Sequence, residues 1–192
     1  MKTLNIESFT LEYFSEFGEF GEYIPDFNRL LTHLSKYGVS ITAILGYGDS
    51  GIAYELSNGD VLKITSNHNE GRISHYFKAN KSEHIINYKS VWREGDLYFI
   101  IMDKIECMAT DSPEISSVIK KIYNKMDSLN SYSLDKVISL IKCDKDIPLT
   151  FKSQILSYLN DLYQSNITGI SDIINLGNIG LSSGKLIFFD IS

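Results

Sequence analysis

Three short segments, far apart in the sequence, contain residue types that together handle phosphate. They are a glycine-rich turn, a lysine in the next apolar stretch, and an Asp, Asn, Asp series toward the end of the chain. In chain order these residues are Gly46, Gly48, Gly51, Lys63, Asp172, Asn178 and Asp190. Backbone amides, a cation and oxygen ligands for a metal, in this order, are what ATP-dependent phosphoryl transfer requires.

The glycine-rich turn lies between two expected strands. Ile41 to Leu45 leads into it, and Ile52 to Leu56 continues as a strand after it. Because glycine has no Cβ, its backbone N–H can approach a phosphate closely. A dinucleotide site needs a strand that leads into a helix, so the second strand argues against one. Taken alone, the spacing also describes an ordinary flexible turn.

Lys63 stands at the centre of an apolar stretch, Val61 to Thr65. A lysine in such a strand is costly unless it is paired or lies at an edge. The best candidate partner is Glu70, seven residues later, in a short helix expected over 69–79. The functional interpretation is that Lys63 neutralises the α- and β-phosphates of a nucleotide. The alternative is an edge-strand lysine in solvent.

The last three polar residues suggest a metal site and a proton acceptor. Asp190 follows the apolar strand 185–189, which would fix its direction. Asn178 and Asp190 are candidate oxygen ligands of Mg²⁺. Asp172 would accept a hydrogen bond from an attacking hydroxyl and orient it. The alternative interpretation is that all three are turn and capping residues, which Asp and Asn favour.

The elements around these residues fall into two groups. A helix is expected to begin at Pro25 and to end near Gly38, and strands follow up to Met102. Helices are expected from Pro113, over 134–141 and over 150–164, and a hairpin over 178–189 closes the chain. Strands first and helices afterwards predict a segregated α+β fold.

Composition narrows the class of protein. The chain has 192 residues, of which 43% are hydrophobic, enough for one domain or two small lobes. A formal charge of −6 gives no global basic footprint for nucleic acid. The two cysteines and four histidines show no zinc-ligand spacing, which indicates free thiols in a reducing compartment. Without a signal peptide or a long apolar run, we expect a cytoplasmic protein that does not contact a membrane.

These segments resemble the protein-kinase-like fold, and more narrowly the short kinase-like proteins of bacteriophages and related mobile elements. The resemblance covers roughly residues 40–192 and is carried by 45–54, 61–64, Glu70, 98–103, 171–180 and 189–192. It implies a two-lobe α+β fold, with an antiparallel β-sheet N-lobe, a reduced helical C-lobe and ATP with Mg²⁺ between them. The expected domains are an N-terminal extension with a helix (1–40), the N-lobe (41–105) and a truncated C-lobe (106–192).

The resemblance also implies roles for individual residues. The expected cofactor-binding residues are Gly46, Gly48, Gly51, Ala53, Lys63, Met102, Asp103 and Ile105. Among them, Met102 to Ile105 would form the interlobe hinge that meets the adenine. The expected catalytic residues are Lys63, Glu70 and Asp172, and the expected metal ligands are Asn178 and Asp190.

Several positions depart from the family pattern. They are Ile170 and Ser171 in place of His-Arg, Ile174 in place of a common lysine, Asn178 six residues after Asp172 rather than five, and Asp190-Ile191-Ser192 in place of Asp-Phe-Gly. The sequence also stops there, so no activation segment is expected. We expect the N-terminal extension, a homodimer or a partner protein to cover the apolar surface that the missing helices would leave.

Three functions fit these features. The first is phosphotransfer from ATP to a protein hydroxyl. The second is a kinase-like binding module, or pseudokinase, which docks on a partner protein and acts by occupancy. If the chain is phage-encoded, either would act in the host cytoplasm. The third is a small-molecule kinase of the aminoglycoside phosphotransferase type, which also uses an Asp, Asn, Asp set but normally has a larger helical lobe for its substrate.

Overall fold

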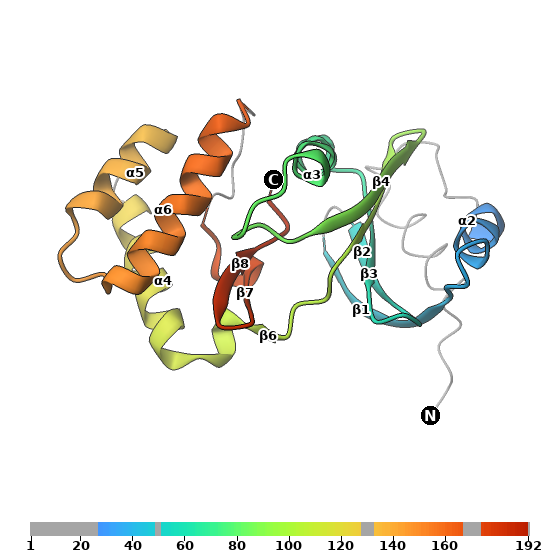
Figure 1. Ribbon diagram of the computed structural model, residues 1–192, viewed down its shortest axis with the longest axis horizontal. Helices are drawn as coiled ribbons and strands as arrows, with labels where there is room; N and C mark the ends of the chain where they lie inside the picture. The colour runs from blue at the N-terminus through green and yellow to red at the C-terminus, as the bar shows by residue number, and fades with distance from the viewer. Residues whose placement is uncertain (1–26, 49–50, 128–132, 167–173, 192) are drawn as a thin grey trace. The chain divides into compact units, whose positions relative to one another are not determined.

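The computed structural model describes residues 27–48, 51–127, 133–166 and 174–191 (Figure 1). The chain forms two compact units. The first takes in the chain up to Lys78 together with Tyr88–Lys104, and the second takes in Ala79–Asn87 and the chain from Ile105 onward. The first unit is built on a β-sheet and the second is mainly helical, so the predicted α+β class is confirmed.

The first unit contains a five-stranded antiparallel sheet with the strand order β1-β2-β3-β5-β4. Its strands are β1 (Ile41–Gly48), β2 (Gly51–Leu56), β3 (Val61–Thr65), β4 (Tyr88–Glu94) and β5 (Leu97–Met102). The turn between β2 and β3 contains Gly59 at φ 84°, and the Asn58-Gly59 pair there is a sequence typical of hairpin turns. All five strands lie between Ile41 and Met102, the range over which the sequence predicts strands.

Helix α2 (Phe27–Ser35) covers one face of this sheet. Leu30 and Leu34, one helical turn apart, are buried in a core that the strands complete from the same face with Ile52, Tyr54, Leu56, Leu62, Ile64, Leu97 and Phe99. The sequence pattern of Phe27, Leu30, Leu31 and Leu34 predicts one apolar stripe, but Leu31 is 37% exposed. It lies about 100° around the helix from Leu30, which turns it away from the sheet.

Helix α3 (His68–Ala79) buries Ile73 and Phe77 and packs against β5 at a position where a side chain would not fit. A Cβ on Gly71 would lie 2.4 Å from the ring of Tyr98. The helix therefore approaches the strand closely because residue 71 is glycine.

The described residues of the second unit form three helices and a small sheet. The helices are α4 (Pro113–Asp127), α5 (Leu134–Cys143) and α6 (Leu149–Gln164), with 3-10 turns η2 (Ala109–Asp111) and η3 (Leu176–Asn178). The sheet has the order β6-β7-β8, from Cys107–Met108, Ile179–Ser182 and Lys185–Phe188. Within the described residues, no helix has the length and apolar character needed to cross a bilayer.

The hairpin of β7 and β8 is fixed to the rest of the second unit through Phe188. The ring of Tyr158 in α6 stacks on the Phe188 ring at 3.7 Å between centroids and 3° between planes. The Phe188 backbone N–H donates to the carbonyl of His84 at 2.8 Å, and its carbonyl accepts from the N–H of Ile86 at 3.0 Å. Residues 84–86 therefore extend this small sheet, a long-range pairing with no signal in local sequence.

Asp144 joins the three helices of the second unit. It follows α5, and its carboxylate is nearly fully buried, with the side chain 2% exposed. That carboxylate accepts hydrogen bonds from Lys125 Nζ of α4 and from the backbone N–H of Asp146, while its backbone carbonyl accepts from Lys152 Nζ of α6. The hydrogen bond from Lys125 above all, and then that from the Asp146 N–H, hold the pKa of the Asp144 carboxyl below its ordinary value.

We therefore predict that the Asp144→Asn variant is less stable than the wild type by about 1 kcal/mol at neutral pH, because the charge that Lys125 binds is lost. A lowered folded-state pKa stabilises the fold fully above the ordinary value of 3.8, and the contribution disappears as the pH falls through the folded-state pKa. Urea unfolding at pH 7 and at pH 3 should show the difference between the two proteins shrinking. Glu114→Gln, at an exposed acid in the first turn of α4, is the control. A constant difference across pH would contradict the assignment.

Candidate functional site

Strand pairing places the glycine-rich turn beside Lys63. Gly46 of β1 pairs with Ala53 of β2, and Ala53 pairs with Lys63 of β3, so the three form one row across the sheet. Gly48 and Gly51 pair with each other two positions along the same strands. Because directly opposed residues and alternate residues of a strand share a face, all five lie over one face of the sheet.

The surface around the turn is open on one side and closely packed on the other. A Cβ built on Gly46 or on Gly48 would meet nothing within 4 Å, whereas a Cβ on Gly51 would lie 2.3 Å from the carbonyl oxygen of Ile64. A side chain at residue 51 would push β2 away from β3. Bare backbone, open space and a neighbouring cation are a combination that fits the phosphate groups of a nucleotide.

The ion pair that the sequence predicts between Lys63 and Glu70 is present. Lys63 Nζ lies 2.8 Å from Glu70 Oε1, and the two side chains are 9% and 4% exposed. Burial of either charge alone would be strongly unfavourable. The opposite charge of the partner offsets that cost for each residue. The pair fixes the lysine on the face that carries the glycine-rich turn.

Helix α3 is built to hold Glu70 in place. The side-chain oxygen of Asn67 accepts hydrogen bonds from the backbone N–H groups of Asn69 at 3.0 Å and Glu70 at 3.2 Å, which caps the start of the helix. Sequence reasoning missed this cap, although Asn67 and Glu70 are spaced as in a capping box. Together with the close approach at Gly71, the cap sets the position of the first helical turn.

The expected hinge residues are divided between the units. Met102 is buried in β5 and belongs, with Asp103, to the first unit. Ile105 belongs to the second unit, where a Cβ on Gly180 would lie 2.1 Å from its Cγ2 atom. The division between the units thus falls within the segment expected to be the hinge.

Ion pairs attach Asp103 to the first unit. Lys89 Nζ lies 2.8 Å from Asp103 Oδ1 and 2.5 Å from Asp60 Oδ1. Hydrogen bonds to Asp103, and then to Asp60, raise the pKa of the Lys89 amine above its ordinary value. The next residue is held as well, since Lys104 Nζ is 2.6 Å from Glu55 Oε1. Sequence reasoning missed this arrangement because its members come from four separate elements.

The two expected metal ligands, Asn178 and Asp190, lie next to each other in the second unit. The Asn178 side-chain amide donates to the backbone carbonyl of Asp190 at 2.9 Å. Asp190 adopts φ 51°, a left-handed conformation that Asp tolerates better than most residues. Asp172, the expected proton acceptor, lies outside the described residues. Among those that are described, no three His, Cys, Asp or Glu side chains form a metal-binding group. A Mg²⁺ ion held by one carboxylate and one amide oxygen would complete its shell with water and phosphate oxygens.

Comparison with known proteins gives a structural likeness alone. No family model and no curated protein matches the chain. Among solved structures, the chain is similar to the crystal structure of a mutant form of the Mycobacterium tuberculosis PknI kinase domain, with a TM-score of 0.42 and 11% sequence identity. The match covers 80% of this chain and 58% of that one, so it spans less than two thirds of the kinase domain's length. An identity this low carries no function from one chain to the other.

The buried ion pair gives a prediction for stability. The Lys63→Met variant should lose about 3 kcal/mol in free energy of unfolding, because the carboxylate of Glu70 would remain buried without its cation. The double variant Lys63→Met with Glu70→Leu should recover most of that loss, since both charges are removed. Chemical denaturation followed by circular dichroism measures both.

The matched control is Lys104→Met, which breaks the more exposed pair with Glu55 and should cost less than about 1 kcal/mol. The two residues would not be tightly coupled if the double variant lost as much free energy of unfolding as the sum of the losses in the single variants Lys63→Met and Glu70→Leu.

Proposed function

We propose that this protein is an ATP-dependent phosphotransferase of the protein-kinase type, which transfers the γ-phosphoryl group of ATP to a protein hydroxyl. The observation that carries the proposal is the buried Lys63–Glu70 pair on the sheet face beneath the glycine-rich turn. Stability alone does not require a buried ion pair at this position, because two apolar residues of similar size would serve as well. Phosphate binding explains why a cation is there.

In this proposal the first unit binds the nucleotide. Lys63 neutralises the α- and β-phosphates, and Glu70 holds the ammonium group in place for them. The backbone N–H groups around Gly46, Gly48 and Gly51 donate to phosphate oxygens. The segment at Met102 and Asp103 contacts the adenine, and the ion pair between Lys89 and Asp103 keeps that segment in position. When bound, Mg-ATP supplies the phosphoryl group to be transferred.

The residues near the end of the sequence supply the remaining chemistry. Asp172 accepts the proton of the substrate hydroxyl as the hydroxyl oxygen forms its bond to the γ-phosphorus and ADP leaves. Asn178 and Asp190 hold the magnesium ion through their side-chain oxygens, and the hydrogen bond between them keeps the two residues together.

A second candidate function is a kinase-like module that acts by binding a partner protein. It is favoured by Ile170 and Ser171, which stand directly before Asp172 where the family that the chain resembles has a histidine and an arginine. A chain that lacks catalysis for this reason would still bind ATP, through Lys63 and the glycine-rich turn.

The test is incubation of the purified chain with Mg²⁺ and γ-labelled ATP, with and without a cell lysate as the source of protein substrate. We expect label on this chain or on a lysate protein, and we expect its loss in both Asp172→Ala and Asp190→Ala, because proton transfer and metal binding each contribute at least about 100-fold to such a reaction. Asp135→Ala, at an exposed acid of α5, is the matched control and should keep the label.

Two other outcomes would change the conclusion. If no label appears but Mg-ATP raises the melting temperature of the wild type, and Asp190→Ala abolishes that rise, the protein is a nucleotide-binding module. If Mg-ATP produces neither label nor a rise in melting temperature, the proposed function is wrong.

A further inference from the structure

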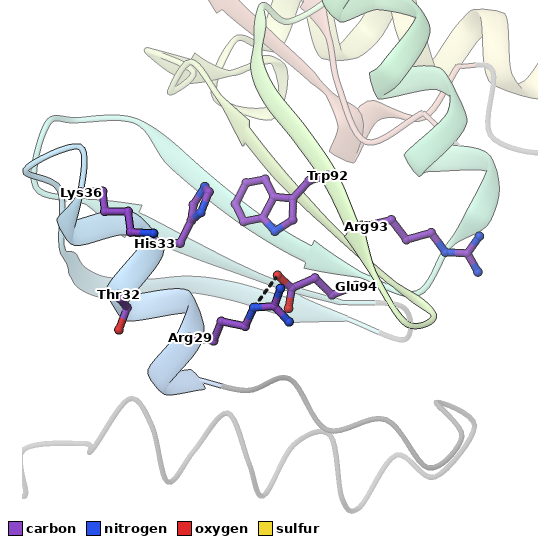
Figure 2. Close-up of a pocket in the computed structure, with 7 residues that line it drawn as sticks. All are labelled: Arg29, Thr32, His33, Lys36, Trp92, Arg93 and Glu94. Carbon is purple, nitrogen blue, oxygen red and sulfur yellow. Dashed lines mark ion pairs between the residues drawn. The ribbon is translucent and has the colours of Figure 1, made fainter.

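A groove of about 410 Å³ lies on the first unit between α2 and β4 (Figure 2). It opens on the face of the sheet that α2 covers, opposite to the face that carries Lys63. The residues that line it are Arg29, Thr32, His33, Lys36, Trp92, Arg93 and Glu94. None of these residues belongs to the candidate nucleotide site, so the groove has no role in the proposed reaction.

One wall of the groove is a single stripe of α2 and the residue just after it. Arg29, Thr32, His33 and Lys36 follow one another at the three- and four-residue spacing that brings side chains to one side of a helix. Leu30 and Leu34 point into the core, so this polar stripe borders the apolar one. The helix therefore has a second row of side chains, which lines the groove and is not part of the buried core.

The opposite wall, on β4, is formed by the ring of Trp92 together with Glu94. The ring of Trp92 stacks on Phe99 at 5.1 Å and 13°, which fixes it against the core of the sheet. The His33 ring lies 4.9 Å from Trp92 at 34°, and Figure 2 shows the two rings side by side at the centre of the groove. Aromatic side chains already held in place are good binding surfaces, because little conformational freedom is lost when a ligand contacts them.

The charge of the groove is positive at its rim. Arg29 lies at the start of α2, 3.7 Å from Glu94 on β4. Lys36 makes no ion pair with any residue in the described part of the chain. Arg93 turns to the other face of the sheet, where its guanidinium lies 5.5 Å from the centre of the Tyr98 ring. The rim thus carries two cations, Arg29 and Lys36, and one acid, Glu94, on a chain whose overall charge is −6.

The sequence before α2 has the complementary composition. Residues 1–26 contain six acids and one lysine, a net charge of −5, and six aromatic residues. This segment joins α2 directly at Phe27, two residues before Arg29. The stretch from Arg29 to Lys36 is about 10 Å long at the helical rise, which about four extended residues can span. Glu19, Glu22 and the aromatic residues near them are therefore within reach of the whole groove.

We propose that residues 1–26 bind in this groove, with aromatic side chains against Trp92 and His33 and with glutamates beside Lys36 and Arg29. Each exposed ion pair contributes little by itself. The covalent link raises the effective concentration of the segment at the groove to about the millimolar range, so weak contacts suffice to fill it. The segment acts as an intramolecular ligand on the face of the sheet remote from Lys63.

Trp92 is the single tryptophan of the chain, so its fluorescence reports on the groove alone. The experiment measures acrylamide quenching of the full-length protein and of its Glu19→Lys, Glu22→Lys double variant. We expect the quenching constant to rise about twofold in the variant, because two attractive pairs become repulsive and the segment leaves the ring. Lys36→Glu should give a similar rise, and combining it with Glu19→Lys and Glu22→Lys should bring the constant back toward that of the wild type.

The matched control is Glu114→Lys with Asp135→Lys, which changes the net charge equally at exposed acids of α4 and α5 and should leave the quenching constant unchanged. Equal constants in the wild type and in all groove and segment variants, at equal melting temperature, would overturn the proposal. Protection of Trp92 that grows with protein concentration would also overturn it, because the occupant would then be a second copy of the chain.

Discussion

The central constraint on the first unit is a positive charge in the middle of a buried strand. All five residues of β3 are buried, and Lys63 is the third of them. A charge in that position needs an opposite charge within contact distance, and Glu70 provides it from α3. Helix α3 therefore has to hold Glu70 within contact distance of Lys63. The Asn67 cap at the start of the helix and the absence of a Cβ at Gly71 both help to fix the position of the helix.

The same strand explains why the sheet needs a helix on each face. Leu62 and Ile64 point to the side that α2 covers, and Lys63 points to the side of α3. A sheet buried on both faces shows an apolar run in its central strand, and not the alternation typical of a sheet with one wet face. The apolar side gives the unit its core, and the polar side, where the glycine-rich turn lies, is available for chemistry. Because of this separation, a ligand in the groove proposed on the α2 side would not contact the residues proposed to bind a nucleotide.

Much of this arrangement could be predicted because its signals are local. The five strands, three helices of the second unit and the terminal hairpin each have a run of apolar residues at the right period with turn residues at the ends. The Lys63–Glu70 pair was predictable because a lysine in an apolar strand requires an acid, and the next helix offers Glu70. The β6 strand has two residues and no period to detect. The ion pairs of Lys89 with Asp60 and Asp103, and the backbone hydrogen bonds of residues 84–86 with β8, join segments that are far apart in sequence. Local sequence patterns contain no information on such pairings.

The most direct test of the account asks whether bound phosphate lies next to Lys63. An acyl-phosphate derivative of ATP transfers its acyl group to an amine that lies beside the bound phosphates, and mass spectrometry identifies the modified lysine. The account predicts acylation of Lys63 in the full-length protein, prevented by excess Mg-ATP, with no comparable protection at the surface residue Lys185. Acylation of surface lysines alone, unaffected by Mg-ATP, would contradict it.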